Sequence, residues 1–146
     1  MTDDQLDVIA IDGPAGSGKS TVAKATAETL GWTYIDTGAM YRCLCLYALR
    51  ENLGTEDVDE LVEALESMDI RMFYEAGEFT VLMEGEDVTE EIRENRVSKR
   101  VSEYAELEPV REELVELQRR LGEDGEAVVE GRDIGTVVFP DAKYKF

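Results

Sequence analysis

A glycine-rich segment near the amino terminus carries the clearest chemical pattern in the sequence. It reads Gly13-Pro14-Ala15-Gly16-Ser17-Gly18-Lys19-Ser20 and matches G-x-x-x-x-G-K-[ST] at every fixed position. Glycines let successive backbone N–H groups curl around phosphate oxygens, and the N-terminus of a following helix adds partial positive charge. In such a loop Lys19 reaches the β- and γ-phosphates of a nucleotide, and Ser20 faces Mg²⁺. The predicted nucleotide-binding residues are Gly13, Pro14, Ala15, Gly16, Ser17, Gly18, Lys19, Ser20 and Thr21.

Two further segments place arginines where a second phosphate can bind. Arg42 lies one helical turn beyond the glycine-containing stretch Asp36-Thr37-Gly38, and a planar guanidinium suits a phosphate group. The pair Arg132–Asp133 follows the apolar run Ala127-Val128-Val129-Glu130. Taken alone, Arg42 is typical of a solvated helix residue, and Arg132–Asp133 is equally typical of a local salt bridge. A phosphate-binding loop also occurs in ATPases, GTPases and small-molecule kinases, so it does not name the reaction.

Alternating strands and helices are expected to position these segments. The run 7–12 predicts a buried strand before the glycine-rich loop, and apolar residues at helical spacing predict a helix that ends at Gly31. A second strand is predicted over 32–36, a helix from about Ala39, and another core strand over 127–130. This order favours a parallel sheet with right-handed crossovers, with ligands at the carboxyl ends of its strands.

The middle of the chain predicts a small antiparallel insert. After a short acidic helix with apolar residues between 58 and 65, alternating runs at 70–74 and 79–83 flank the turn residues 75–78. Residues 84–87 can lead into a third short strand, and helical character returns over 94–103. A longer helix then carries apolar residues from 107 to 121 with Pro109 in its first turn, and a last strand begins near Lys143.

Composition excludes several function classes. The net charge of −19, from 34 acidic and 15 basic residues, repels nucleic acid and anionic membranes. The absence of histidine removes Ser-His-Asp chemistry and most zinc sites. Without a signal peptide or membrane-length apolar run, the expected location is cytoplasmic. Cys43 and Cys45, two positions apart on a helix, favour packing or an unreactive surface thiol over a disulfide or a shared metal. The acidic, lysine-poor surface suggests a high-salt cytoplasm, a hypothesis under which stability rises with KCl.

The three chemical segments together resemble the cytidylate kinase family. GPAGSGKS, DTGAMYR and EGRDIGTVVFPDA occur in that family's order and at about its spacing. The insert with EGEDVTEEIR matches the enlarged nucleoside-monophosphate domain of the bacterial-type members. The resemblance covers essentially all 146 residues and corresponds to the amino-terminal two-thirds of a family member. It implies an α/β fold: a P-loop nucleoside-monophosphate-kinase-like parallel sheet flanked by helices, with a small antiparallel β insert.

The resemblance also implies residue roles. Lys19, Arg42 and Arg132 would be catalytic, and Arg42 and Arg132 would clamp the phosphate of an acceptor, CMP or dCMP. Ser102, Arg111 and Asp133 would contact the cytosine base, and Thr37 would lie near the bound nucleotide. The implied reaction is transfer of the ATP γ-phosphoryl group to an oxygen of CMP. This oxygen is already anionic, so the reaction needs no strong general base, in agreement with the absence of histidine.

The resemblance also predicts what differs from the family. The family continues into an arginine-rich lid and last core elements that this sequence does not contain, so we expect a truncated form with little activity alone. The expected domains are a P-loop core at 1–55 and 104–146 and a nucleoside-monophosphate-binding insert at 56–103. The family is usually monomeric, and exposed sheet surface gives this chain a route to self-association. Two alternatives stay open: another small P-loop kinase, and a non-catalytic nucleotide-binding or interaction module.

Overall fold

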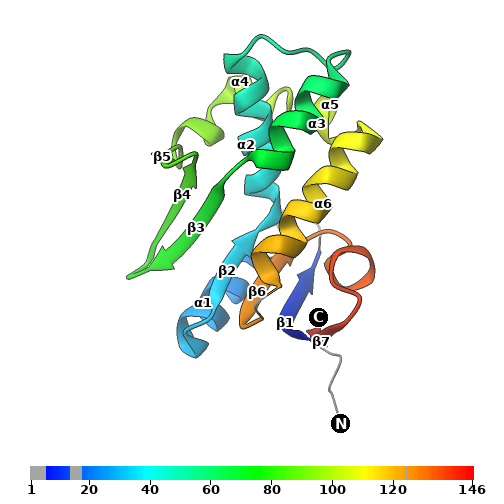
Figure 1. The fold of residues 1–146 in the computed structure, drawn as a ribbon. Coiled ribbons are helices and arrows are strands. Elements are labelled where there is room, and N and C mark those ends of the chain that lie inside the picture. Colours follow the sequence, from blue (N-terminus) through cyan, green and yellow to red (C-terminus); the bar gives the residue numbers. More distant parts are fainter. Residues whose placement is uncertain (1–5, 14–17, 124) are drawn as a thin grey trace. The chain divides into compact units, whose positions relative to one another are not determined.

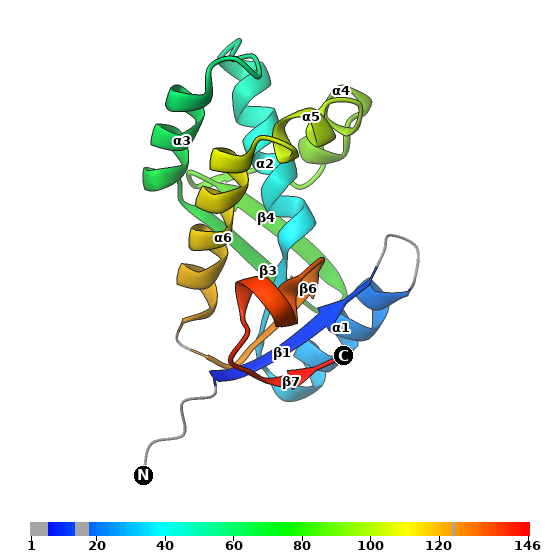
Figure 2. The ribbon, with the colours of Figure 1, turned by 90° about the vertical axis from the view of Figure 1, so that its right-hand side faces the viewer.

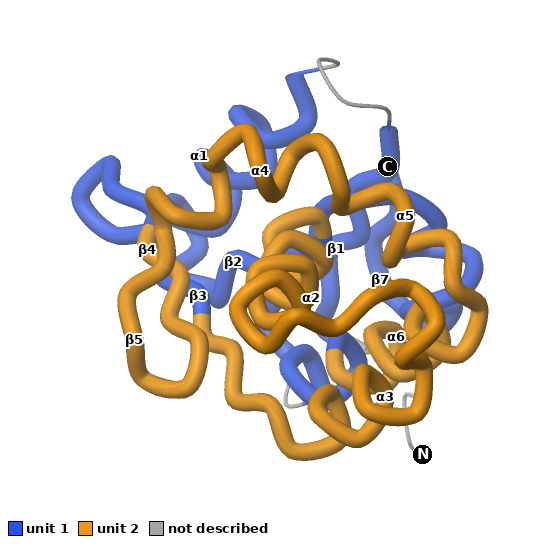
Figure 3. Tube along the Cα trace, turned by 90° about the horizontal axis from the view of Figure 1, so that it is seen from above, with its two compact units in different colours: residues 1–37, 72–79, 118–146 blue, residues 38–71, 80–117 orange. Residues whose placement is uncertain are grey.

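The described chain divides into two compact units. The computed structural model describes residues 6–13, 18–123 and 125–146, and Figure 1 shows their helices and strands. One unit contains residues 1–37, 72–79 and 118–146, and the other contains residues 38–71 and 80–117, as coloured in Figure 3. Each unit therefore joins segments that lie far apart in the sequence.

A four-stranded parallel sheet forms the centre of the first unit. Its strands are β1 (Leu6–Asp12), β2 (Thr33–Asp36), β6 (Ala127–Gly131) and β7 (Ala142–Lys145), in the order β2-β6-β1-β7. The pairs β1–β6, β1–β7 and β2–β6 are all parallel, which confirms the prediction of a parallel sheet. In Figure 2, β1 lies between β6 and β7. The register pairs Asp36 with Glu130 and Asp12 with Gly131, so polar strand ends meet at one edge.

Helix α1 (Lys19–Leu30) packs on one face of this sheet. Ile9 and Ile11 of β1 form a buried cluster with Ala23 and Ala27 of α1, joined by Tyr34 and Val128 from the neighbouring strands. Because side chains alternate between faces along a strand, the even-numbered residues of β1 lie on the other face. The helix ends as predicted at Gly31, whose φ of 70° is left-handed and whose N–H donates to the carbonyl of Ala27.

A short π-helix, η2 (Ile134–Val138), packs against β1 and β6. Its carboxyl end is held by Arg119, near the end of α6 (Glu108–Gly122). The guanidinium of Arg119 donates to the carbonyl oxygens of Val137 at 2.8 Å and Val138 at 3.0 Å. These bonds satisfy carbonyls that the last turn of a helix leaves without an internal partner.

The remaining elements follow the predicted insert closely. Strands β3 (Ile70–Glu75), β4 (Glu78–Met83) and β5 (Glu86–Asp87) form a sheet in that order, and β4 and β5 are antiparallel. At the turn between β3 and β4, Ala76 and Gly77 both have positive φ, as a tight hairpin turn of type I′ requires. The helices are α2 (Thr37–Arg50), α3 (Val58–Ser67), η1 (Glu91–Arg93), α4 (Asn95–Ser98) and α5 (Val101–Ala105). The helical character predicted over 94–103 is thus divided between two short helices.

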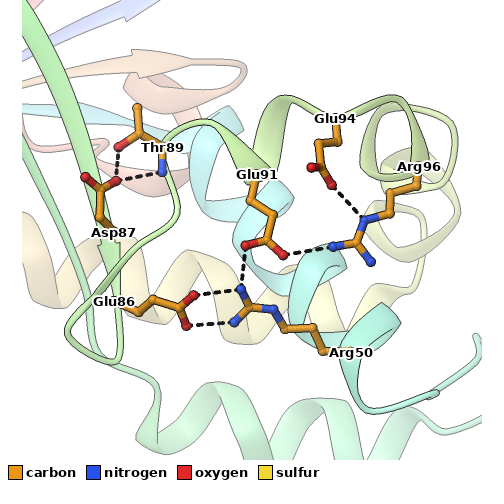
Figure 4. Close-up of polar contacts among 7 residues, drawn as sticks. All are labelled: Arg50, Glu86, Asp87, Thr89, Glu91, Glu94 and Arg96. Atoms are coloured by element: carbon orange, nitrogen blue, oxygen red, sulfur yellow. Dashed lines mark hydrogen bonds and ion pairs between the residues drawn. The ribbon is translucent and has the colours of Figure 1, made fainter.

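A chain of ion pairs links four elements of the second unit. The guanidinium of Arg50, in α2, contacts both carboxylate oxygens of Glu86 at 2.9 Å and one oxygen of Glu91 at 2.6 Å (Figure 4). Arg96, in α4, contacts the other oxygen of Glu91 at 2.8 Å and Glu94 at 2.9 Å. The hydrogen bonds from Arg50 hold the pKa of Glu86 below its usual value. The network therefore ties β5 and η1 to α2 and α4.

Cys43 and Cys45 both lie buried in α2 and form no disulfide, so of the two predicted alternatives burial supports packing over a surface thiol. Among the described residues, we find no helix whose length and apolar character suffice to cross a membrane.

Candidate active site

The glycine-rich segment begins where β1 ends and leads into α1. Of its nine predicted residues, Pro14, Ala15, Gly16 and Ser17 lie outside the described residues. Gly18 precedes α1 with a φ of 84°, a left-handed conformation that favours glycine. Lys19, Ser20 and Thr21 form the first turn of α1, so the strand, loop and helix follow one another in the predicted order.

Ser20 is tied directly to the carboxyl end of β6. Its hydroxyl donates to Oε1 of Glu130 at 2.6 Å, and Glu130 is only 2% exposed. Within the described residues, Oε2 of Glu130 and the hydroxyl of Tyr34 have no hydrogen-bond partner of good geometry. A buried carboxylate oxygen without a partner, beside the hydroxyl at the start of α1, is an arrangement in which a bound cation can be stabilised.

The electrostatic surroundings of these groups favour their protonated forms. Burial raises the pKa of Glu130; the hydrogen bond from Ser20 opposes this shift, and the nearby negative charge of Asp36 adds to it. Burial also raises the pKa of Tyr34, and the charges of Asp36 and Glu130 add to that effect. A cation at this position would reverse the balance and favour the ionised carboxylate.

Thr37 and Gly131 pack closely beside Glu130, the hydrogen-bond partner of Ser20. The Thr37 hydroxyl, which is buried, donates to the backbone carbonyl of Glu130 at 2.9 Å. A side chain at Gly131 would collide with this hydroxyl, so the close approach requires glycine. The N–H of Gly13 donates to the carbonyl of Gly131 at 3.2 Å, which joins the start of the glycine-rich segment to the end of β6.

Arg132 and Asp133 follow directly and are both exposed. Asp133 has φ 58° and ψ 28°, a left-handed conformation that aspartate tolerates better than most residues. It immediately precedes η2, so the pair occupies a sharp turn between a core strand and a helix. This turn stands at the sheet edge where the glycine-rich segment also begins.

The other predicted acceptor residues belong to the second unit. Nη1 of Arg42, in α2, donates to the carbonyl of Ile92 at 3.0 Å and to Oγ of Ser98 at 2.9 Å. Ser102 in α5 and Arg111 in the first turn of α6 are both exposed. The first unit thus brings together the ends of β1 and β6, the start of α1 and Thr37, and the second unit carries Arg42, Ser102 and Arg111.

Comparison with known proteins identifies the family. The family model described as cytidylate kinase matches residues 9–146, which is nearly the whole chain. The chain belongs to the cytidylate kinase family. The match confirms the resemblance on which the residue roles were predicted, and the parallel sheet with its antiparallel insert confirms the fold class.

Curated relatives agree with this assignment. A cytidylate kinase of Caldanaerobacter subterraneus subsp. tengcongensis is 54% identical over 138 residues, covering 94% of this chain and 60% of the relative. One of Chlorobaculum tepidum is 52% identical over 141 residues, covering 94% of this chain and 58% of the relative. One of Streptococcus uberis is 50% identical, with 94% and 61% covered. The chain therefore spans about 60% of the length of the curated relatives it matches.

The sequence predicts no role for three polar residues that lie beside predicted site residues. Asp12 and Glu130 are the polar ends of the apolar runs that form β1 and β6, and Ser98 contacts Arg42 from α4. A charged residue at the carboxyl end of a buried strand is a signal that the sequence offers, because ligands bind at that edge in parallel sheets. The sequence offers no comparable signal for Ser98, since its contact spans 56 positions.

Proposed function

We propose that this chain is part of an enzyme that transfers the γ-phosphoryl group of ATP to CMP or dCMP. The bond between the γ-phosphorus and the β-phosphate oxygen breaks, a bond to an acceptor phosphate oxygen forms, and ADP and CDP or dCDP leave. The observation that carries the proposal is the junction of two loops at one sheet edge. Gly13 hydrogen-bonds Gly131 and Ser20 hydrogen-bonds Glu130. The glycine-rich segment, which would bind the phosphates of the donor ATP and is called the donor-phosphate loop below, therefore starts beside the Arg132–Asp133 turn.

The donor side of this reaction rests on the start of α1. Lys19 would neutralise charge on the β- and γ-phosphates of ATP, and the backbone N–H groups at the start of α1, from Gly18 to Thr21, would bind phosphate oxygens. The Ser20 hydroxyl and the buried carboxylate of Glu130 suit a bound Mg²⁺, since oxygen donors are the ligands this ion prefers. When bound, the ion would offset the negative charge of the transferring phosphoryl group.

The acceptor side rests on arginines and on a pattern of polar groups for the base. Arg42 and Arg132 would clamp the acceptor phosphate, because a guanidinium can bind two phosphate oxygens at once. The bonds to Ile92 and Ser98 already fix the position of the Arg42 side chain. Thr37 would lie near the bound nucleotide, in a position held by the hydrogen bond from its hydroxyl to the backbone carbonyl of Glu130.

Selectivity for cytosine would come from Asp133, Arg111 and Ser102. A carboxylate accepts from the exocyclic amine of cytosine, and an arginine donates to the ring nitrogen or the carbonyl oxygen. Uracil reverses the donor and acceptor at ring positions 3 and 4, so Asp133 would face a carbonyl oxygen. The unpaired polar groups would penalise UMP as an acceptor.

A coupled assay of ADP release tests the proposal on the 146-residue chain. Mg-ATP is supplied with CMP, dCMP, UMP, AMP and shikimate in turn, and the fold of each sample is checked by circular dichroism. Turnover with CMP and dCMP that is lost on Lys19→Ala supports the proposal. The exposed Lys143 provides a matched control, since Lys143→Ala removes the same charge near the amino end of β7, away from the carboxyl ends of the strands.

Two results would contradict the proposal. Faster turnover with UMP, AMP or shikimate than with CMP would indicate another small P-loop kinase. Absence of turnover by the folded chain, together with absence of CMP binding by calorimetry, would leave a nucleotide-binding or interaction module as the better description.

A further inference from the structure

Asp12 bridges two distant parts of the first unit. It is the last residue of β1, and because Ile11 before it packs on the face covered by α1, Asp12 projects from the opposite face. There its Oδ1 accepts the N–H of Ile134 at 2.6 Å, and its Oδ2 accepts the N–H of Gly135 at 3.1 Å. Both carboxylate oxygens are thus used by consecutive N–H groups at the start of η2.

The next residue along the chain makes a second contact to the same turn. Gly13 donates its N–H to the carbonyl of Gly131 at 3.2 Å. The exposed pair Arg132–Asp133 therefore lies between two anchors, one at Gly131 and one at Ile134–Gly135. Both anchors come from the dipeptide Asp12–Gly13, which opens the predicted donor-phosphate loop.

A carboxylate is an unfavourable choice here on charge alone. The chain already carries a net charge of −19, and another negative charge beside a phosphate-binding loop repels nucleotides. A carboxylate is nevertheless the side chain that can accept two adjacent N–H groups without donating, and such charge-assisted bonds are strong. The two hydrogen bonds therefore explain why an acidic residue occupies position 12, although its charge disfavours nucleotide binding.

We propose that Asp12 is a positioning residue that holds the acceptor-binding turn Arg132–Asp133 in register with the donor-phosphate loop. This inference rests on the proposed function, since it takes the turn to bind the acceptor. Asp12 itself touches neither reactant in this account. It acts through the backbone at Ile134 and Gly135.

The direction in which CMP affinity changes when Asp12 is replaced distinguishes a positioning role from a purely electrostatic one. If Asp12 acted only through its charge, neutralising it would tighten the binding of both CMP and ADP, because both are anions. If it positions the turn, its loss weakens CMP binding by about tenfold, the size expected for losing a hydrogen bond to a charged group. ADP affinity would stay unchanged or increase in the same variant.

The experiment compares Asp12→Asn and Asp12→Ala with the control Asp7→Asn in the 146-residue chain. Asparagine keeps the shape and one acceptor oxygen but turns an NH₂ group toward one of the two N–H donors. Asp7 lies at the other end of β1, is exposed, and is 3.9 Å from Lys143. Calorimetry gives the dissociation constants for CMP and ADP, and hydrogen exchange follows the amides of Ile134 and Gly135.

We expect faster exchange at Ile134 and Gly135 and weaker CMP binding in both Asp12 variants, with the smaller change in Asp12→Asn. Wild-type exchange rates at these amides would overturn the inference, whether or not the chain binds CMP. Tighter CMP binding, or an equal loss of CMP and ADP affinity, would also overturn it. If the wild-type chain does not bind CMP, the proposed acceptor fails, and accelerated exchange would then show only that the anchor exists.

Discussion

At the scale of single residues, the carboxyl end of β6 combines complete burial with an ionisable side chain. All four residues from Ala127 to Glu130 are buried, although the last of them is a carboxylic acid. Burying a carboxylate costs free energy unless hydrogen bonds or a cation offset the loss of water. The bond from Ser20 and the positive charge of Lys19 offset part of this cost. We interpret Glu130 as a residue kept for ligand binding rather than for stability.

Tyr104 in the second unit offers the opposite case, a buried polar group with a structural partner. Its hydroxyl donates to the carbonyl of Leu53 at 2.6 Å, and the side chain is 1% exposed. We expect Tyr104→Phe to lower the free energy of unfolding by about 1 kcal/mol, since the half-buried Leu53 carbonyl loses its partner. Urea unfolding measures this change. The exposed Tyr144 is the matched control, because Tyr144→Phe should leave stability nearly unchanged.

Cys45 should make stability fall at alkaline pH. Burial raises the pKa of its thiol, and the positive charge of Arg100 opposes this shift only in part. Because the folded pKa exceeds the unfolded one, the unfolded chain releases the proton first as the pH rises. The free energy of unfolding should therefore decrease above the ordinary thiol pKa of about 8.5. Urea unfolding at several pH values should show a smaller decrease in Cys45→Ala than in the wild type.

The thiol reagent DTNB gives an independent check. Both cysteines have no exposed surface, so the folded protein should react slowly and the protein in concentrated urea rapidly. Rapid reaction of the folded protein, or parallel pH curves for the wild type and Cys45→Ala, would contradict this account.

At the scale of elements, the end of β6 is the most constrained turn of the first unit. Gly131 approaches Thr37 closely, Asp133 adopts a left-handed conformation, and η2 begins at the next residue. These features allow a strand to pass into a helix within a few residues. They place Arg132 at the turn with little backbone freedom.

Gly131→Ala tests how tightly this turn is packed. The new methyl group would collide with the Thr37 hydroxyl and come within 3.1 Å of the Ile134 side chain. We expect a loss of about 1–3 kcal/mol in the free energy of unfolding, the range typical of overpacking. Because the closest atom belongs to Thr37, the same substitution should cost less in a Thr37→Ala background. Equal costs in both backgrounds, measured by urea unfolding, would show that the Thr37 contact is not limiting.

At the scale of the whole molecule, the charge of −19 sets two opposing effects of salt. Salt weakens ion pairs such as those of Arg50, but pairs so accessible to water contribute little to stability. Salt also screens the mutual repulsion of the acidic residues, because the Debye length falls from about 10 Å at 0.1 M to about 3 Å at 1 M. The excess of 34 acidic over 15 basic residues makes the second effect the larger one.

We therefore expect the unfolding temperature to rise with KCl between about 0.1 and 1 M. We also consider a variant in which three exposed residues, Glu63, Glu78 and Glu112, are changed to Gln. The loss of three negative charges brings its net charge from −19 to −16. It should respond less to KCl than the wild type. A flat response of the wild-type chain would reject the high-salt hypothesis.

Local patterns in the sequence were sufficient to predict most of the helices and strands, and also the family. Apolar runs bounded by charge located β1 and β6, helical spacing with Gly31 located α1, and alternation around residues 75–78 located the hairpin. These patterns involve residues close together in the sequence, because the geometry of a helix or a strand sets the spacing of its buried side chains. The motif GPAGSGKS and its companions were specific enough to predict the family that the comparison confirms. The roles of individual site residues and the domain boundaries stay predictions.

The contacts between residues far apart in the sequence could not be predicted and became visible in the folded chain. The bonds between Ser20 and Glu130 and between Asp12 and Ile134 join positions 110 and 122 residues apart. They depend on the strand order β2-β6-β1-β7 and its register, which no local pattern encodes. The helix η2 also owes its position to Asp12 and Arg119, which bind its two ends from other elements. Local spacing specifies each element, whereas sheet pairing brings the polar carboxyl ends of β1, β2 and β6 to one edge.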